Sequence, residues 1–161
     1  TIPSGASNAI YQGSLVIMTA AGNIDIAASS SADIVGVFNG CFYTDPTTGK
    51  PTHSNYYPGS IAASDIVATV YDDPRIVFEV QCDGTLAATA VGENADTTST
   101  TGGSTVTGLS STEISASTGA SAAQLRIIGI SKDPDNSDTG SANTNAYVLI
   151  NEHAYTQTAG T

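Results

Sequence analysis

The hydrophobic residues of this chain fall into short runs separated by polar, turn-forming stretches. The runs are rich in Val, Ile and aromatic residues and are bounded by Gly, Pro, Asn or Asp, a pattern typical of β-strands. The clearest runs are SLVIMT at 14–19, DIVGVFNGCFYTD at 33–45, the stretches 65–71 and 75–82, QLRIIGI at 124–130 and AYVLINEHAY at 146–155. About eight to ten strands follow from this pattern. We therefore predict an all-β fold, either a single β-barrel or a β-sandwich domain.

Local features refine two of these runs. The first run is followed by AGN at 21–23 and then by IDIA at 24–27, which indicates a β-hairpin. Gly36 and Gly40 interrupt the second run, and glycine inside a strand is typical of a bulge or of a close approach between two backbones.

The first thirteen residues, TIPSGASNAIYQG, carry no strand or helix period. We interpret residues 1–13 as an extended N-terminal arm and residues 14–161 as the β domain. Within the arm Ile2, Pro3, Ile10 and Tyr11 are apolar, and an extended segment can add its backbone hydrogen bonds to the sheet edge of a neighbour. We therefore predict that these four residues contact a partner. The alternative is that the arm folds back onto its own domain or frays.

Long polar loops join several of the predicted strands. The least core-like stretch is 92–111, and SKDPDNSDTGSANTN at 131–145 reads as a surface loop. Between them TEISAS at 112–117 alternates weakly, as a strand does. Ser110 and Glu113 also fit a helix capping box, so a short helix is the alternative there.

The charge of the chain restricts its partners. The net charge is −11, and Lys50, Arg75, Arg126 and Lys132 are all the Lys and Arg residues present. Such a chain cannot build the basic surface that nucleic acids or anionic membranes require, so neither is an expected partner. No apolar run is long enough to span a membrane. The chain begins at Thr1; removal of an initiator Met would explain this, and a longer processed leader is the alternative.

Cys41 and Cys82 are the two cysteines, and each lies in a hydrophobic, strand-like context. Two buried free thiols are the favoured interpretation, with a disulfide as the alternative. Neither cysteine has the neighbours that a metal site requires.

One acidic pair stands out, at Asp72-Asp73-Pro74. Adjacent residues of an extended chain point to opposite faces, so these two carboxylates are not aimed at one substrate. Asp followed by Pro is typical of a turn, and we interpret the stretch as a corner between two strands.

Other candidate chemistry is equally weak. Asp133, Asp135 and Asp138 resemble a calcium loop superficially, but Ser137 and Asp138 occupy the places that an EF-hand gives to an acid or amide and to Gly. His53 and His153 stand in no catalytic motif, and no nucleophile elbow or P-loop is present. We therefore predict no catalytic residues, no metal site and no cofactor: the chain is a structural or binding module rather than an enzyme.

The order of segments from Tyr11 to Tyr155 resembles the small decoration, or cement, proteins of tailed bacteriophage capsids. The segments that carry the resemblance are YQGSLVIMTAAGNIDIA, IVGVFNGCFYTD, ATVYDDPRIVFEVQCDG and the closing stretch from GLSSTEIS to VLINEHAY. The resemblance implies a non-enzymatic virion protein on the outer capsid surface, made in the cytoplasm of the bacterial host. It also implies the major capsid protein as partner and a homotrimer as oligomeric state. A secreted adhesin, fibre or surface-layer module is the main alternative, and a small β-barrel enzyme or sugar-binding domain is the second.

Overall fold

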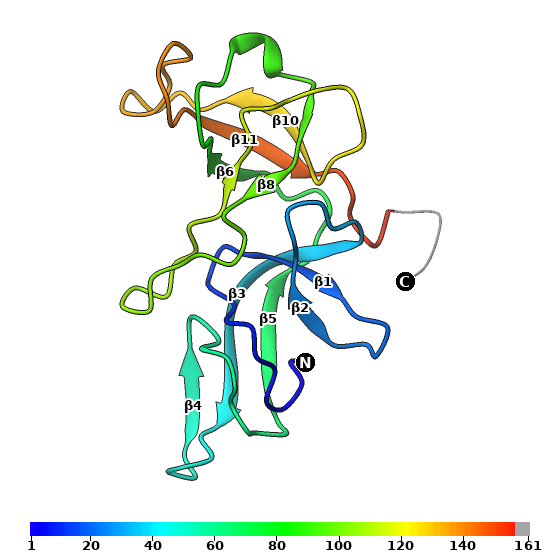
Figure 1. Cartoon of the computed structure of the whole chain (residues 1–161), viewed down its shortest axis with the longest axis vertical. Coiled ribbons are helices and arrows are strands. Elements are labelled where there is room, and N and C mark those ends of the chain that lie inside the picture. The colour runs from blue at the N-terminus through cyan, green and yellow to red at the C-terminus, as the bar shows by residue number, and fades with distance from the viewer. Residues whose placement is uncertain (157–161) are drawn as a thin grey trace.

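The computed structural model describes residues 1–156, which form an all-β molecule with eleven strands and one short 3-10 helix. Figure 1 shows the strands gathered into two lobes, one at each end of the longest axis. The elements are β1 (Leu15–Met18), β2 (Ile24–Ile26), β3 (Ile34–Thr44), β4 (Pro51–Ser54), β5 (Val67–Tyr71), β6 (Phe78–Gln81), η1 (Ala88–Ala90), β7 (Asn94–Ala95), β8 (Thr97–Thr98), β9 (Glu113–Ile114), β10 (Leu125–Ile130) and β11 (Asn145–Ile150).

The first sheet is organised around β3. This strand pairs with β5 along one edge, whereas β1 and β4 share its other edge, and β2 extends the sheet beyond β1. All these pairings are antiparallel. The register of β3 against β5 shifts between Phe38 and Gly40, so the bulge predicted from the glycines is confirmed.

The second sheet has the strand order β6-β11-β10-β7 and is also antiparallel. Its strands follow the period of two that one buried face requires. Ala146, Val148 and Ile150 of β11 are buried, while the residues between them are partly exposed. A small third sheet pairs β8 with β9. Within residues 1–156 none of the sheets closes into a barrel, so of the two predicted architectures the arrangement is the sandwich-like one.

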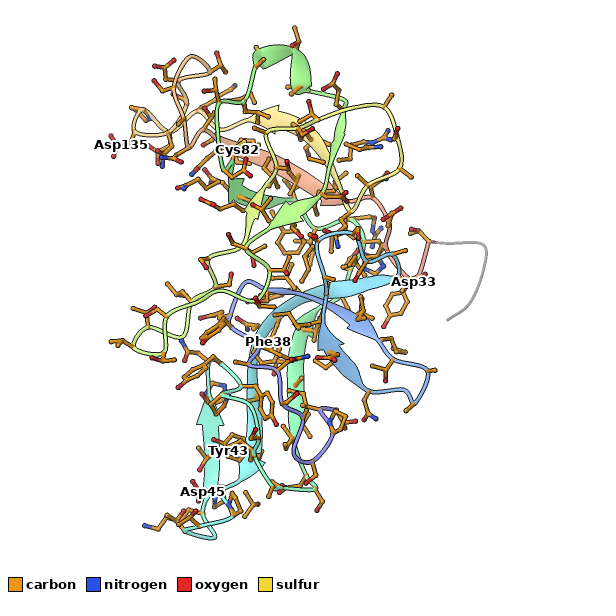
Figure 2. All side chains as sticks on the ribbon, viewed as in Figure 1. Asp33, Phe38, Tyr43, Asp45, Cys82 and Asp135 are labelled. Carbon is orange, nitrogen blue, oxygen red and sulfur yellow. The ribbon has the colours of Figure 1, made fainter. Side chains whose placement is uncertain are left out.

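The buried side chains form two clusters. The β3 core consists of Ile2, Ile10, Val16, Ile24, Ile26, Phe38, Cys41, Tyr43, Tyr57, Ala63 and Ile66. The β11 core consists of Leu15, Ala27, Ile34, Cys82, Leu86, Ala90, Ala95, Ile114, Leu125, Ile127, Ala146, Val148 and Ile150. Figure 2 shows Phe38 and Cys82 in the two different lobes. The first lobe contains the first sheet, and the second lobe contains the second sheet. Leu15, Ala27 and Ile34 belong to the first lobe by their place in the chain but pack in the β11 core, so the two lobes share buried surface.

The N-terminal segment differs from the predicted free arm. The Ile2 amide donates to the Ile66 carbonyl oxygen at 3.2 Å, and Ile10 and Tyr57 exchange two backbone hydrogen bonds of 2.9 and 2.8 Å. Ile2 and Ile10 are 4% and 1% exposed. The physical reason is that the open side of the β3 core needs a cover, and these apolar side chains supply it.

The structure also decides between a strand and a short helix in the stretch after Ser110. Ser110 and Glu113 do not begin a helix: Glu113 and Ile114 form β9, whose partners are Thr98 and Thr97.

No helix among residues 1–156 combines the length and the apolar character of a membrane span.

Candidate functional site

The most exposed large hydrophobic residue of the described chain lies at the tip of a hairpin formed by residues 99–111. Its turn is closed by two backbone hydrogen bonds, from the Ser104 amide to the Leu109 oxygen at 2.9 Å and from the Gly108 amide to the Ser104 oxygen at 2.7 Å. Val106 at the tip is 93% exposed. Figure 1 shows this segment, yellow-green, projecting from the waist of the molecule.

The base of this tip hairpin (residues 99–111) is held firmly. The Gln12 amide donates to the Gly108 oxygen, and the Ser110 amide donates back to the Gln12 oxygen, both at 2.9 Å. The Asn55 side-chain amide donates to the Thr107 oxygen at 2.6 Å. Gly103 lies directly on the ring of Tyr11, where a side chain would collide. The tip is therefore presented on a fixed support rather than on a loose loop.

A second apolar surface lies on the first sheet. Phe42 of β3 and Val67 of β5 are directly paired across the strands and are 48% and 53% exposed. His53 of β4 is the partner of Phe42 on the other side and is also exposed. Tyr71, at the end of β5, is half exposed as well. Among residues 1–156 β5 pairs only with β3, so it is an edge strand.

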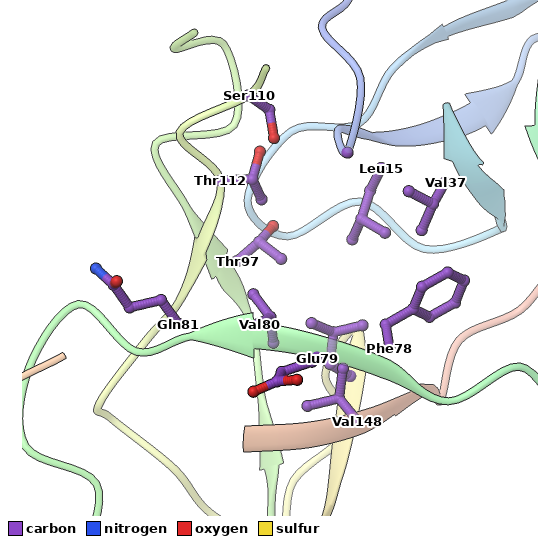
Figure 3. Close-up of a pocket in the computed structure, with 12 residues that line it drawn as sticks. Leu15, Val37, Phe78, Glu79, Val80, Gln81, Thr97, Ser110, Thr112 and Val148 are labelled. Atoms are coloured by element: carbon purple, nitrogen blue, oxygen red, sulfur yellow. The ribbon is translucent and has the colours of Figure 1, made fainter. Parts of the chain in front are cut away.

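A cavity of about 290 Å³ lies where the two sheets meet. Leu15 and Val37 of the first sheet face Phe78 and Val80 of the second across it, as Figure 3 shows. Ser110 and Thr112 form a hydroxyl-bearing rim beside them. The cavity is chiefly apolar and contains no pair of titratable groups suited to acid–base catalysis.

The four residues predicted to contact a partner do not form a common exposed surface. Ile2 and Ile10 lie in the β3 core, and Tyr11 is 8% exposed and stacks on Tyr56 with ring centroids 5.5 Å apart. Pro3 alone of the four is exposed. Within the chain Ile2, Ile10 and Tyr11 thus pack as in the alternative given for the arm, folded back onto its own domain, where they hold the N-terminal segment and the tip hairpin in place.

The acidic pair forms the corner predicted from the sequence. Asp73 accepts a hydrogen bond from the Arg75 amide at 2.9 Å, and its carboxylate lies 3.3 Å from the Arg75 guanidinium. The Arg75 side chain and amide together lower the pKa of Asp73. Asp72 lies 3.5 Å from the Tyr155 hydroxyl. The corner carries the chain from β5 in the first sheet to β6 in the second.

His153 lies behind this corner and is completely buried. Its Nδ1 accepts a hydrogen bond from the Tyr155 amide at 3.1 Å, while Nε2 has no partner within residues 1–156. Burial lowers the pKa of His153, and the Asp72 carbonyl and the carboxylates of Asp72 and Asp73 partly oppose that effect. The imidazole is thus packed as a neutral group between the end of β11 and the corner.

The remaining candidates have local structural roles. Asp133 accepts the Asp135 amide at 3.1 Å, and Asp138 accepts the Gly140 amide and the Ser141 hydroxyl, both at 2.8 Å. These bonds are those of polar turns. Within residues 1–156 no group of His, Cys, Asp and Glu side chains has the arrangement of a metal site.

The cysteines are free thiols that lie in different cores. The disulfide alternative is therefore excluded, and burial raises the pKa of Cys41 to about 11.

Comparison of this chain with protein-family models, with curated proteins and with solved structures found no match.

Proposed function

We propose that this chain is a structural protein without an enzymatic function that binds the outside of an assembled phage capsid and stabilises the shell. The observation that carries the proposal is the tip hairpin, which holds an almost fully exposed valine on a rigid base. The chain does not bury this side chain itself, and contact with another protein would remove its apolar surface from water. The proposed partner of the tip hairpin is the major capsid protein.

The charge of the chain supports the same role. A net charge of −11 keeps the protein soluble before assembly and gives DNA no attractive surface. The order of the strand segments, which resembles that of decoration proteins, supports the assignment to a tailed phage.

Shell stabilisation follows from mass action. A protein that binds the assembled shell but not its separated subunits shifts the equilibrium toward the shell, by an amount that grows with its concentration relative to its dissociation constant. Burying one valine at such a contact contributes roughly 1.5–3 kcal/mol before ordering costs. Because many copies bind one shell, a modest contact at each site is sufficient.

The test is a binding experiment with undecorated shells of the phage that encodes the chain. Co-sedimentation with the shells and raised thermal stability of the particles are expected for the wild-type chain. The Val106→Asp variant is expected to lose most of this binding, because it would bury a charge at the contact. Absence of the chain from purified virions, together with no binding to shells, would overturn the proposal.

A matched control is available beside the second sheet, away from the tip hairpin. Val91 is 45% exposed and follows η1, outside the tip hairpin. Val91→Asp makes the same chemical change there and is expected to leave shell binding unchanged. If both variants bind as the wild type does, the contact lies elsewhere, and Phe42→Ser on the first sheet is the next variant to test.

The proposed oligomeric state is a homotrimer. It rests on the resemblance to decoration proteins, which commonly sit where three shell subunits meet, and on the open edge of β5, which another chain can cover. Native mass spectrometry of the free protein and cryo-microscopy of decorated shells distinguish a trimer from a monomer.

A further inference from the structure

The apolar cavity between the two sheets adjoins a second hollow of different character. The cavity of about 290 Å³ and a hollow of about 330 Å³ share three lining residues, which are Gln81, Ser110 and Thr112. The other residues that line the hollow are also polar, namely Ser99, Ser111 and Glu113. Figure 3 shows Ser110 and Thr112 at the edge of the cavity, on the side away from Phe78. An apolar space thus lies directly beside one that is rich in hydroxyl groups.

The apolar space is large enough for an alkyl chain. Val37, Phe78 and Val80 line it and pack against the β11 core, yet each stays partly exposed, so the chain leaves apolar surface uncovered there. An apolar cavity of about 150 Å³ accommodates a six-carbon ring, so this cavity accommodates a chain of about eight carbons. Binding of such a chain would remove both apolar surfaces from water.

The polar space offers hydrogen-bonding groups on a fixed support. The Ser110 amide donates to the Gln12 oxygen at 2.9 Å, and the Ser111 amide donates to the Gly102 oxygen at 3.1 Å. The Thr112 hydroxyl is buried and has no hydrogen-bond partner within residues 1–156. Rotation about its χ1 angle exchanges this hydroxyl with the methyl group, so it can turn toward a ligand that supplies the missing partner. A buried hydroxyl that gains a partner in this way favours binding.

Charge selects the polar group of the ligand. Glu113 lines the hollow, and its carboxylate accepts a hydrogen bond from the Gln81 side-chain amide at 2.8 Å. With this carboxylate and a net charge of −11, an anionic group such as a carboxylate or phosphate is repelled. A single carboxylate that already has a partner does not make a cation site. The hydroxyl groups both donate and accept hydrogen bonds, as those of a sugar do.

We propose that the two hollows bind a neutral amphiphile, with one alkyl chain of about eight carbons and a sugar-like head. The alkyl chain lies in the cavity between Leu15 of the first sheet and Phe78 of the second, and the head lies among the hydroxyl groups of residues 110–112. A largely apolar pocket with a few polar groups at one end is the usual form of a small-molecule site. This site does not depend on shell binding, because Val106 lines neither hollow.

The test is a titration of the full chain with octyl glucoside, kept below the concentration at which it forms micelles and followed by NMR of the backbone amides. Saturable shifts are expected at Leu15, Val80 and Thr112. Hexyl glucoside lacks two methylenes and is expected to bind about 15-fold more weakly, since each buried methylene contributes about fourfold to affinity. Glucose alone is expected to cause no shift, which distinguishes an amphiphile site from a site for free sugar.

Variants separate the two ends of the site. Val80→Phe fills the cavity and is expected to abolish binding. Thr112→Val keeps the shape of the side chain but removes the hydroxyl, and it is expected to weaken octyl glucoside binding about two- to tenfold. Thr98→Val is the matched control, because the Thr98 hydroxyl is also buried without a partner among the described residues but lines neither hollow. It is expected to leave the affinity unchanged.

Three results with the wild-type chain would overturn the proposal. The first is the absence of saturable shifts with octyl glucoside, and the second is shifts confined to residues outside the two hollows. The third is binding of octanoate or octylamine as tight as that of octyl glucoside, which would show that the site does not select a neutral, hydroxylated head. Because all three are read from the wild type, they do not depend on whether a variant folds.

Discussion

The two lobes bury their hydrophobic residues by different means. In the second lobe, alternation along β11 and the first four residues of β10 supplies the core, with buried residues at every second position. In the first lobe, β3 is buried along most of its length, and irregular segments such as 1–10 and 57–66 cover it. Figure 1 shows these segments running beside the sheet rather than within it. The face of the first sheet that looks away from the second sheet thus obtains its cover from segments that lack a strand period.

The comparison also shows that the lobes depend on each other. Ile34 begins β3 of the first sheet, yet it packs in the β11 core and pairs with His153. The Ile34 amide donates to the Glu152 oxygen at 2.9 Å, and the Ala154 amide donates to the Ile34 oxygen at 2.8 Å. We therefore expect the two lobes to unfold together.

Deletion of residues 1–10 is expected to have the largest effect. It removes the buried side chains of Ile2 and Ile10 and uncovers Tyr57, at a cost of about 3–6 kcal/mol for the two isoleucines. This cost is a large part of the stability of a typical domain. Denaturant unfolding measures this cost as a lower midpoint, with a single transition expected for both lobes. A truncated chain as stable as the wild type would restore the interpretation of a free arm.

Ile34→Ala tests the dependence of the lobes. A cavity at a fully buried isoleucine costs about 2–5 kcal/mol, and we expect the loss of hydrogen-exchange protection to reach β10 and β11 as well as β3. Phe38→Ala, in the β3 core, is the comparison variant. If the Ile34 variant loses protection in the first lobe alone, the shared buried surface does not couple the two lobes.

Gly40→Ala tests whether the first sheet depends on a close backbone contact that Gly129 in the second sheet does not make. Gly40 has a φ of +131°, and an added Cβ would lie 2.8 Å from the Ser54 carbonyl oxygen. We expect a loss of about 1–3 kcal/mol, from strain and displacement of β4. Gly129→Ala in β10 is the control, because its Cβ would meet only a Tyr147 ring carbon at 3.6 Å. Equal thermal shifts for the two variants would contradict this account.

The pH dependence tests the junction between the lobes. Because the folded-state pKa of His153 is lowered, the unfolded chain binds a proton first as the pH falls below about 6.5. The stability contributed by neutral His153 is therefore present above that pH and is lost as the solution becomes more acidic, by about 1.4 kcal/mol per unit of pKa difference. Urea unfolding at pH 7.5 and 5.5 measures the loss. His153→Gln is expected to reduce the difference, whereas His53→Gln at the exposed His53 is not.

Val106→Asp is expected to have the smallest effect on stability, within about 0.5 kcal/mol, because the side chain is almost fully exposed and contributes little to either core. Thermal unfolding of the isolated protein measures this. A stability close to that of the wild type, together with lost shell binding, would show that Val106 contacts a partner and does not contribute to folding.

Much of the strand content could be read from the chain. The runs at 14–19, 33–45 and 124–130 correspond to β1, β3 and β10, since β-branched residues between turn formers leave few other structures. The run at 75–82 predicts a longer strand than the structure has: β6 begins at Phe78, because Asp73 and Arg75 form the corner before it. The sequence pattern does not indicate the tip hairpin, since its polar residues resemble an unstructured loop.

The sequence by itself determined the all-β class, the turns at Asp and Pro, and the bulge at Gly40, because each depends on the local preferences of a few neighbouring residues. Only the tertiary structure decided where the N-terminal segment lies and which residues are exposed. Ile2 and Ile10 look equally available for a partner or for the chain's own core, and the uncovered side of β3 selects the core. The cavity between the sheets is likewise tertiary, because Leu15 and Val80 lie far apart along the chain and only the packing of the first sheet on the second brings the two side chains to one cavity.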